Sequence, residues 1–270
     1  MREIRGAENR KDHSSTESIQ GILFLLLLLA IMSSILPGCT SVANPDVHGS
    51  PGDLHPNPGF ITLNPPEDIQ VLSLDGDILI AGGIDGVYAI DTFSHRVTSN
   101  PFNCPESMRF VRSFSRDRTT GNLWIGYDEG VSIANGTRCD LYSEPAGFPR
   151  QRANWITQDP AGTMWIGTWQ DAYYVKNGGL QRLSPSGGLL DPMVNRILAD
   201  RNGGIWFGSG VAPRGGISLM NNGTWQYFTI ENGLPHNNIN AFLEDSDGSV
   251  WATTGPVSYT HLTLPTNREV

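Results

Sequence analysis

Residues 121–126 read GNLWIG, residues 162–167 read GTMWIG, and residues 203–208 read GGIWFG. One glycine-bracketed tryptophan phrase is thus repeated at intervals of 41 residues. Self-similarity with a period of about 40–45 residues is typical of repeat folds, in which each unit buries its apolar surface against its neighbours. This interval predicts a repeat architecture before any single residue is considered.

The phrase extends beyond these three copies. Trp251 follows Trp206 after 45 residues, and the weaker copy LDGDILIAGG at 74–83 has Leu79 in the tryptophan position, 45 residues before Trp124. An acid also stands upstream of the glycine turn in every copy. The acids are Asp75, Asp117, Asp159, Asp200 and Asp245.

Each unit has the same expected order of elements. A β-prone run precedes the acid, the tryptophan strand follows the glycine turn, and a second turn, a third strand and a looser fourth strand come after it. Four short antiparallel strands in about 41–45 residues are expected of one β-propeller blade. The tryptophan would fill the space between adjacent blades. The prediction is an all-β, incomplete β-propeller of four-stranded blades, with about four blades and part of a fifth.

The copy INAFLEDSDGSVWATT at 239–254, preceded by ENGLPHN at 231–237, resembles the two-component regulator propeller repeat of bacterial sensor proteins. The copies at 194–209 and 154–168 are similar to it. The resemblance implies a propeller that often has seven blades and usually forms the periplasmic sensing half of a histidine kinase. We therefore expect an extracytoplasmic ligand-sensing or protein-interaction domain of a two-component system, with a histidine kinase as partner.

Residues 1–38 resemble an export signal. Basic residues precede the apolar run 21–36, whose 16 residues span about 24 Å as a helix, short of the ~30 Å hydrocarbon core of a bilayer. The following LPGCT resembles a lipobox, in which Cys39 becomes the lipidated first residue. We expect an exported, membrane-anchored lipoprotein that faces the periplasm or the cell exterior, with an uncleaved anchor or an ordinary cleaved signal as alternatives. Residues 39–58, rich in Pro, Gly and Ser, are expected to form a flexible linker.

The repeat pattern stops near residue 255, so residues 59–255 are assigned to the partial propeller. The tail PVSYTHLTLPTNREV at 256–270 resembles a translated adapter sequence. We expect it to be non-native and the reading frame to be truncated, with a five-bladed ring closed by a native tail as the alternative. The segment GFITLN at 59–64 is similar to YFTIEN at 227–232, and is expected to be the outer strand of a closing blade.

The charge and the cysteines limit the partners and the compartment. A net charge of −9, without any lysine- or arginine-rich run, argues against a general affinity for nucleic acid. Cys104 and Cys139 lie 35 residues apart. In an oxidising compartment they either form a disulfide or remain two isolated thiols.

No catalytic or metal-binding pattern stands out. The six histidines lack metal-ligand spacing, and there is neither a G-x-S-x-G motif nor a phosphate-binding glycine loop. We expect no cofactor, no metal and no catalytic residue. A propeller lyase or glycan-active enzyme is the alternative to a sensor, and a structural cell-surface lipoprotein is a further alternative.

A polar residue stands five positions before each acid in the expected first strand. These residues are Gln70, Arg112, Asn154, Asn195 and Asn240. First strands line the central channel of a propeller. The five side chains therefore form a polar ring that binds a ligand or water, or they satisfy backbone groups at the starts of strands.

The loops that enter the first strands share one face with the turns between second and third strands, and propellers usually bind ligands on that face. The candidate ligand-binding residues there are Trp169, Gln170, Asp171, Arg152, Arg214 and His236. Trp169 is the best candidate because exposed aromatic side chains stack readily on sugars and peptides. Packing of Trp169 on a neighbouring blade is the alternative. The expected ligand is a small molecule, a glycan or a peptide.

Overall fold

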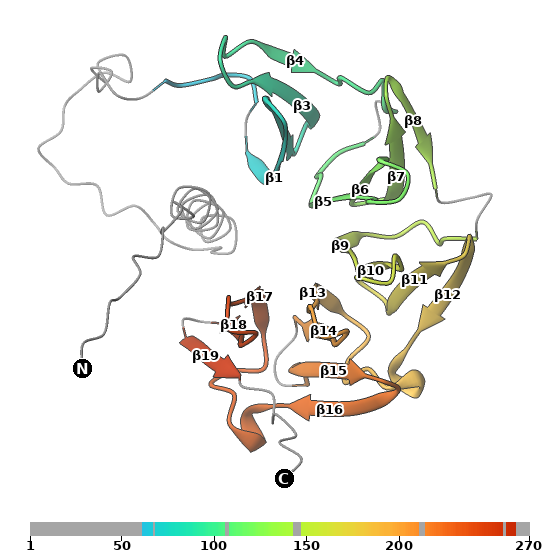
Figure 1. Ribbon diagram of the computed structural model, residues 1–270, viewed down its shortest axis with the longest axis vertical. Coiled ribbons are helices and arrows are strands. Elements are labelled where there is room, and N and C mark those ends of the chain that lie inside the picture. Colours follow the sequence, from blue (N-terminus) through green and yellow to red (C-terminus); the bar gives the residue numbers. More distant parts are fainter. Residues whose placement is uncertain are drawn as a thin grey trace, which may run out of the picture. The chain divides into compact units, whose positions relative to one another are not determined.

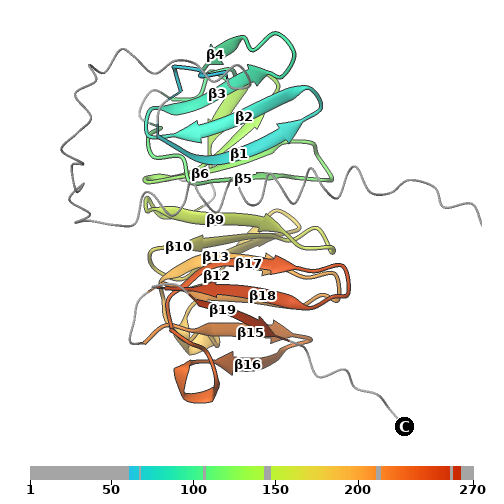
Figure 2. The ribbon, with the colours of Figure 1, turned by 90° about the vertical axis from the view of Figure 1, so that its left-hand side faces the viewer.

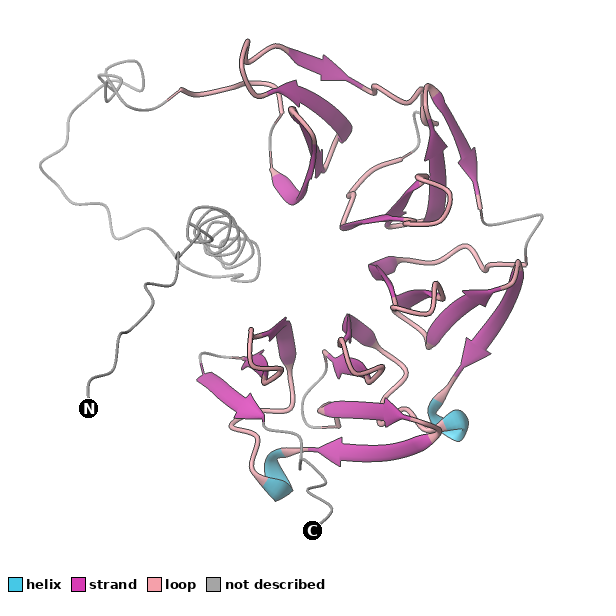
Figure 3. Cartoon of the chain, viewed as in Figure 1, coloured by secondary structure: helices cyan, strands magenta, loops and turns pink. Residues whose placement is uncertain are grey.

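The computed structural model describes residues 61–66, 68–105, 108–142, 147–210, 214–255 and 258–262. These residues form five antiparallel sheets within the compact unit Leu63–Val270 (Figures 1 and 3). Each sheet packs on the next one along the chain, with its first strand on the inner side (Figure 1). The side view shows the strands of each sheet running side by side (Figure 2). The sheets are the blades of a β-propeller, as predicted, and are numbered 1 to 5 below.

The strands of every blade follow the order of the chain. Blade 1 comprises β1 (Ile69–Asp75), β2 (Ile78–Gly83), β3 (Gly86–Asp91) and β4 (Val97–Ser99). Blade 2 comprises β5 (Ser113–Arg116), β6 (Leu123–Tyr127), β7 (Gly130–Asn135) and β8 (Arg138–Leu141). Blade 3 comprises β9 (Ala153–Gln158), β10 (Met164–Thr168), β11 (Ala172–Lys176) and β12 (Gly179–Leu183). Blade 4 comprises β13 (Val194–Ala199), β14 (Ile205–Ser209), β15 (Ile217–Asn221) and β16 (Thr224–Phe228). Blade 5 comprises β17 (Ile239–Glu244), β18 (Val250–Thr254) and β19 (Ser258–Leu262). Two short 3-10 helices, η1 (Pro185–Gly187) and η2 (Ile230–Asn232), follow the outer strands of blades 3 and 4.

The hydrophobic core lies between neighbouring blades rather than within any one of them. Trp124 of blade 2 packs against Ile156 of blade 3, and Trp165 of blade 3 packs against Ile197 of blade 4. Trp206 of blade 4 is completely buried in the equivalent place. The prediction that the recurring tryptophans fill the space between blades is confirmed for these three, whereas Trp251 in blade 5 is 38% exposed.

In blades 2, 3 and 4, the glycine that follows the tryptophan by two residues lets the next blade approach. A Cβ atom on Gly208 would lie 2.7 Å from Cγ2 of Ile239, and one on Gly167 would lie 2.8 Å from Cγ1 of Val194. Real side chains do not come so close, and overpacking of this kind is costly. These glycines are therefore required by contact between blades, in addition to the glycines of the turns.

Blade 1 departs from the predicted alignment by one residue. Gly82 is the glycine that approaches blade 2, since its Cβ would lie 2.5 Å from Cγ1 of Val111. Two residues before it stands Ile80, which belongs to the core between blades 1 and 2. Leu79 packs on the other face of blade 1. The assignment of Leu79 to the tryptophan position was wrong, because the turn after Asp75 is shorter than in the later units and shifts the register.

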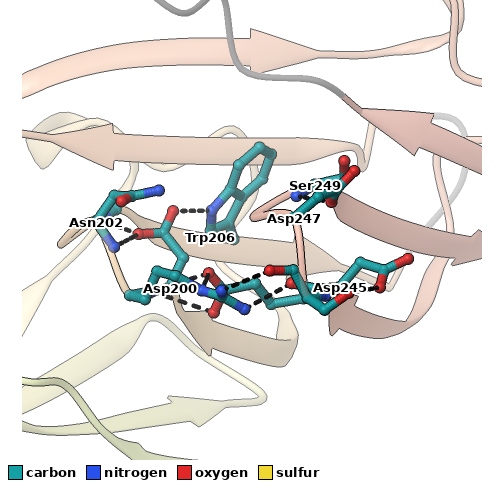
Figure 4. A network of polar contacts seen from close by, with 10 residues as sticks. Asp200, Asn202, Trp206, Asp245, Asp247 and Ser249 are labelled. Atoms are coloured by element: carbon teal, nitrogen blue, oxygen red, sulfur yellow. Dashed lines mark hydrogen bonds and ion pairs between the residues drawn. The ribbon is translucent and has the colours of Figure 1, made fainter. Parts of the chain in front are cut away.

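In blades 3 and 4, the recurring acid holds both the glycine turn and the tryptophan. In blade 4, Oδ1 of Asp200 accepts hydrogen bonds from the backbone N–H groups of Asn202 (2.9 Å) and Gly204 (2.7 Å), and Oδ2 accepts one from Nε1 of Trp206 (2.8 Å; Figure 4). Blade 3 repeats the bond between Asp159 and the indole of Trp165 at 2.9 Å. The acid thereby joins the turn to the side chain that fills the interface.

Arginines in two of the first turns reach across to the next blade. Nε of Arg201 in blade 4 bonds Oε1 of Glu244 in blade 5 at 2.6 Å, and Nη2 bonds the carbonyl of Asp245 at 2.6 Å. In blade 2, the backbone N–H of Arg118 bonds the side chain of Gln158 in blade 3 at 2.8 Å. Its guanidinium also bonds backbone carbonyls of blade 3. These contacts connect the turns of adjacent blades beside the apolar core.

Cys104 and Cys139 form a disulfide in the structure. Cys104 is buried in the core between blades 1 and 2, in the connection that precedes blade 2, and Cys139 lies in β8. The bond therefore connects the segment that links these blades to the outer strand of blade 2.

The two ends of the predicted propeller differ from expectation in part. Ser258–Leu262 form β19 and pair with β18, although residues 256–270 were assigned to a tail outside the repeat. Pairing satisfies the backbone groups along one edge of β18, and Tyr259 and Thr260 are residue types that favour strands. No strand forms at 61–64, the described part of the predicted closing strand; there Leu63 packs on blade 1.

The export signal at 1–38, Cys39 and the linker at 39–58 lie outside the described residues. Within the described part of the chain, no helix has the length and apolar character that a membrane crossing requires.

Asp200→Ala should destabilise the chain by about 2–4 kcal/mol, because it leaves the buried indole N–H and the turn amides without acceptors. The matched control is Asp75→Ala in blade 1, where the carboxylate makes only a surface ion pair with Arg116. That change should cost about 0–1 kcal/mol. Urea unfolding of both variants measures the difference, and equal losses would contradict the structural role given to Asp200.

Loss of the disulfide should lower the free energy of unfolding by about 2–4 kcal/mol. The measurement is thermal unfolding with and without a thiol reductant, for the native chain and for a Cys104→Ser/Cys139→Ser variant. Reductant should lower the Tm of the native chain to that of the variant and leave the variant unchanged. An identical Tm for the native chain in both conditions would argue against the bond.

Candidate functional site

The entry loops of the first strands and the turns between second and third strands meet on one face. The backbone N–H of Trp169, in the turn after β10, bonds the carbonyl of Arg152, just before β9, at 3.2 Å. Nη2 of Arg152 also bonds Oδ2 of Asp128 in the corresponding turn of blade 2 at 3.3 Å. Arg150 and Glu129 form a second ion pair between the same two blades. The surface on which the candidates were expected therefore exists as a connected set of loops.

Trp169 is the exposed centre of this set. Its side chain is 49% exposed, and the guanidinium carbon of Arg152 lies 4.9 Å from the ring centroid. Asp128 holds Arg152 in place, with 3.1 Å between Nε and Oδ1, and also accepts a 2.5 Å hydrogen bond from Nε of Arg112. Cation–π contact and the shared carboxylate fix the indole from one side. We call Trp169, Arg152, Asp128 and Arg112 the Trp169 cluster.

Gln170 and Asp171 have different environments, although they follow Trp169 directly. Gln170 is exposed. Asp171 is only 3% exposed, has a positive φ of 74°, and accepts a 2.6 Å hydrogen bond from Nε of Arg182. This bond raises the pKa of the Arg182 guanidinium. Asp171 was expected to contact ligand, but its carboxylate is used inside the blade, which makes it a residue that shapes the turn.

Arg214 and His236 come from blades 4 and 5. Arg214 is well exposed, and its Nε lies 3.9 Å from Oδ2 of Asp191. Nδ1 of His236 accepts a 3.0 Å hydrogen bond from the backbone N–H of Asn238, so this nitrogen is occupied by its own loop. Among the described residues, no hydrogen bond or ion pair connects either side chain to the Trp169 cluster. The predicted six-residue site is therefore centred on blade 3.

The predicted polar ring coincides with bulges in the first strands. Register shifts place Gln70, Asn154, Asn195 and Asn240 opposite no partner residue in the second strand, and Arg112 immediately precedes β5. A bulge changes the direction of its side chain. This irregularity explains why a polar residue recurs five positions before the acid.

Three of the five ring residues bond protein groups. Nδ2 of the buried Asn154 donates to the carbonyl of Val194 in blade 4 at 3.0 Å, which ties two inner strands together. Gln70 bonds a backbone carbonyl at 3.5 Å, and Arg112 bonds Asp128. The side chains of Asn195 and Asn240 have no such partner in the described part of the chain. The interpretation of the ring as backbone-satisfying side chains thus fits Asn154 and Gln70.

Sequence reasoning missed Arg196, next to the ring residue Asn195. Its guanidinium lies over the ring of Trp155, 4.8 Å from the centroid, and Nη1 donates to the carbonyl of Asn195 at 2.8 Å. Nε is buried and lacks a hydrogen-bond partner. Burial lowers the pKa of Arg196 to about 10, with a further contribution from the charge of Arg112. The only sign in the sequence that Arg196 is unusual is its position within the mostly apolar strand VNRILA.

A concavity lies between blades 2 and 3, beside the turns that connect their first and second strands. It has a volume of about 490 Å³ and is lined in part by Trp124, Tyr142, Asp117 and Asn177. Asp117 stands seven residues before Trp124, one more than the spacing in blades 3 and 4, and its carboxylate bonds Thr120 (2.7 Å) instead of an indole. Burial acts to raise the pKa of Asp117, but hydrogen bonds from its own turn and from Gln158 outweigh it and lower the pKa. The indole of Trp124 makes no hydrogen bond to the described residues.

The described residues contain no group of three or more His, Cys, Asp or Glu side chains placed to hold a metal ion. The polar clusters on the loop face consist of arginines paired with carboxylates.

Known proteins resemble the chain in sequence repeats and in fold. Residues 147–170, 188–210 and 233–255 match the family model described as two component regulator propeller. These segments contain the first two strands of blades 3, 4 and 5. No curated protein matches the chain.

Similar solved structures include the extracellular domain of BT3049 from B. thetaiotaomicron, which is named as a hybrid two component system. It has a TM-score of 0.62 and 23% identity over 72% of this chain and 28% of that one. The extracellular domain of BT4673 from the same organism has a TM-score of 0.57 and 17% identity over 76% of this chain and 29% of that one. PorZ of Porphyromonas gingivalis, a surface component of the type-IX secretion system, has a TM-score of 0.56 and 14% identity over 75% of this chain and 34% of its own.

The present chain spans about a third or less of each of these proteins. At these identities the likeness extends to the fold alone. Three repeats of the chain match the two component regulator propeller model, and the blades that contain them have the propeller fold.

Proposed function

We propose that the chain is the ligand-binding propeller of an extracytoplasmic sensor in a two-component system, and that the Trp169 cluster contacts the ligand. The observation that carries the proposal is a half-exposed indole held by a charged partner. Trp169 belongs to none of the buried clusters between the described blades. The family match and the extracellular domains of similar fold support the sensor role.

The cluster suits a ligand with a flat apolar face and polar edges. The free side of the indole can stack on the face of a sugar ring or on a peptide side chain, and rigid aromatic residues lose little conformational entropy when they bind. Arg152 and the exposed Gln170 lie beside the indole and can donate hydrogen bonds to acceptors on the ligand. A glycan or a peptide therefore fits the surface.

The remaining parts of the sensor follow from the sequence. The apolar run before Cys39 would export the chain, and lipidation of Cys39 would hold it at a membrane facing the periplasm or the cell exterior. A histidine kinase would then receive the signal, as the family suggests. Anchor, compartment and kinase form one proposal with the ligand-binding role.

Trp169→Ala should weaken ligand binding strongly without unfolding the chain. Binding is measured on glycan and peptide arrays, followed by titration of whichever compound is retained. Loss of a central aromatic contact weakens binding by about 30-fold or more, equivalent to roughly 2 kcal/mol. Because the side chain is half-exposed, stability should change by less than about 1 kcal/mol.

The matched control is Phe93→Ala, which removes a 77% exposed aromatic side chain in blade 1. It should bind as the native chain does. Retention of full affinity by Trp169→Ala would remove the Trp169 cluster from the binding surface, and an equal loss in both variants would show that the effect is not local.

A further inference from the structure

Arg196 differs from most of the other arginines of the described chain in its electrostatic environment. Nine of them form ion pairs with a carboxylate, and in four of these pairs both side chains are exposed. Arg196 is only partly exposed, yet it pairs with no carboxylate in the described residues. Removing a charge from water without a partner is costly. Such a residue is either a stability cost without benefit or the receptor of a charge that the chain itself does not supply.

The surroundings of Arg196 add positive charge instead of neutralising it. Arg196 lies in β13, the inner strand of blade 4, and stacks on Trp155 in β9, the inner strand of blade 3 (Figure 1). Arg112, at the entry to the inner strand of blade 2, is close enough to disfavour the charge of Arg196. The one carboxylate beside Arg112 is that of Asp128, which Arg152 also shares.

The guanidinium is fixed in place and retains a free donor group. Trp155 covers its face, and the bond from Nη1 to the carbonyl of Asn195 sets its orientation. Nη2 makes no hydrogen bond to the described residues and is not among the fully buried atoms. The side-chain amide of Asn195, which also has no partner there, lies against Gly210, where any Cβ would clash with it. The edge of the guanidinium is thus available, and the residue next to it carries an amide without a partner in the described chain.

We propose that Arg196, stacked on Trp155 and assisted by the amide of Asn195, forms an anion-binding site at the inner edge of blades 3 and 4 that takes a carboxylate group. A planar guanidinium matches the two oxygens of a carboxylate, and one cation with one neutral donor suits a single negative charge better than a phosphate dianion. The site does not include Trp169 and does not rest on the sensor role.

The test compares the native chain with Arg196→Gln, with Arg214→Gln as a matched control that removes the same charge from an exposed loop. Thermal unfolding is recorded in sodium chloride and in sodium acetate at equal ionic strength. Acetate at roughly ten times its Kd should raise the Tm of the native chain and of Arg214→Gln by about 2–4 °C. Arg196→Gln should show no acetate-dependent shift, and its Tm in chloride should equal or exceed that of the native chain.

Saturation-transfer difference NMR on the methyl group of acetate gives a direct measurement of binding. The signal should be present with the native chain and lost with Arg196→Gln. An acetate shift or an NMR signal that persists in Arg196→Gln would overturn the proposal, as would a stronger response to inorganic phosphate than to acetate. Should Arg196→Gln fail to fold, Arg196→Lys keeps the charge but not the planar fork, and its acetate response should be clearly weaker than that of the native chain.

Discussion

The packing of one blade's tryptophan against the inner strand of the next blade is the interaction on which the structure depends. A single four-stranded sheet has two faces to cover, and in blades 2, 3 and 4 each face is covered by a neighbour about forty residues away in the chain. Three features serve that contact. The indole fills the gap, the glycine two residues later lets the strand approach, and the acid six residues earlier in blades 3 and 4 binds the indole N–H. These features explain why the phrase recurs as a unit.

Much of the fold could be predicted from the sequence because its signals are local and repeated. The spacing of the tryptophans indicates the blades, and the turns between strands can be read from glycine and aspartate. The misplacement of Leu79 has a physical cause: spacing was measured from one tryptophan to the next, while the shorter turn of blade 1 shifts Ile80 into the interface. The hydrogen bond from Trp206 to Asp200 was not foreseen, since a recurring acid is equally consistent with an ordinary turn.

The candidate site was less predictable because its residues come from loops that do not repeat. Trp169 stands in an exposed turn, as a ligand-binding aromatic residue should, but the adjacent Asp171 is buried. Nothing in the letters GTWQDA distinguishes these environments, which depend on a left-handed backbone at Asp171 and on Arg182 across the sheet. Arg196 was overlooked because an arginine in a strand is usually solvated, and only the packing of two inner strands reveals that it lacks a carboxylate. Charge pairing is a property of the assembled blades.

The turn of blade 2 contains one more residue than those of blades 3 and 4, and the difference extends beyond the turn. Asp117 no longer reaches the indole of Trp124, which instead forms part of the wall of a concavity between two blades. Blade 2 keeps its four strands, and the tryptophan still fills its interface. In an array of nearly identical modules, inserting a single amino acid into a hairpin can thus create a new recess while the scaffold is preserved. Such proteins can diversify their surfaces at little risk to their architecture.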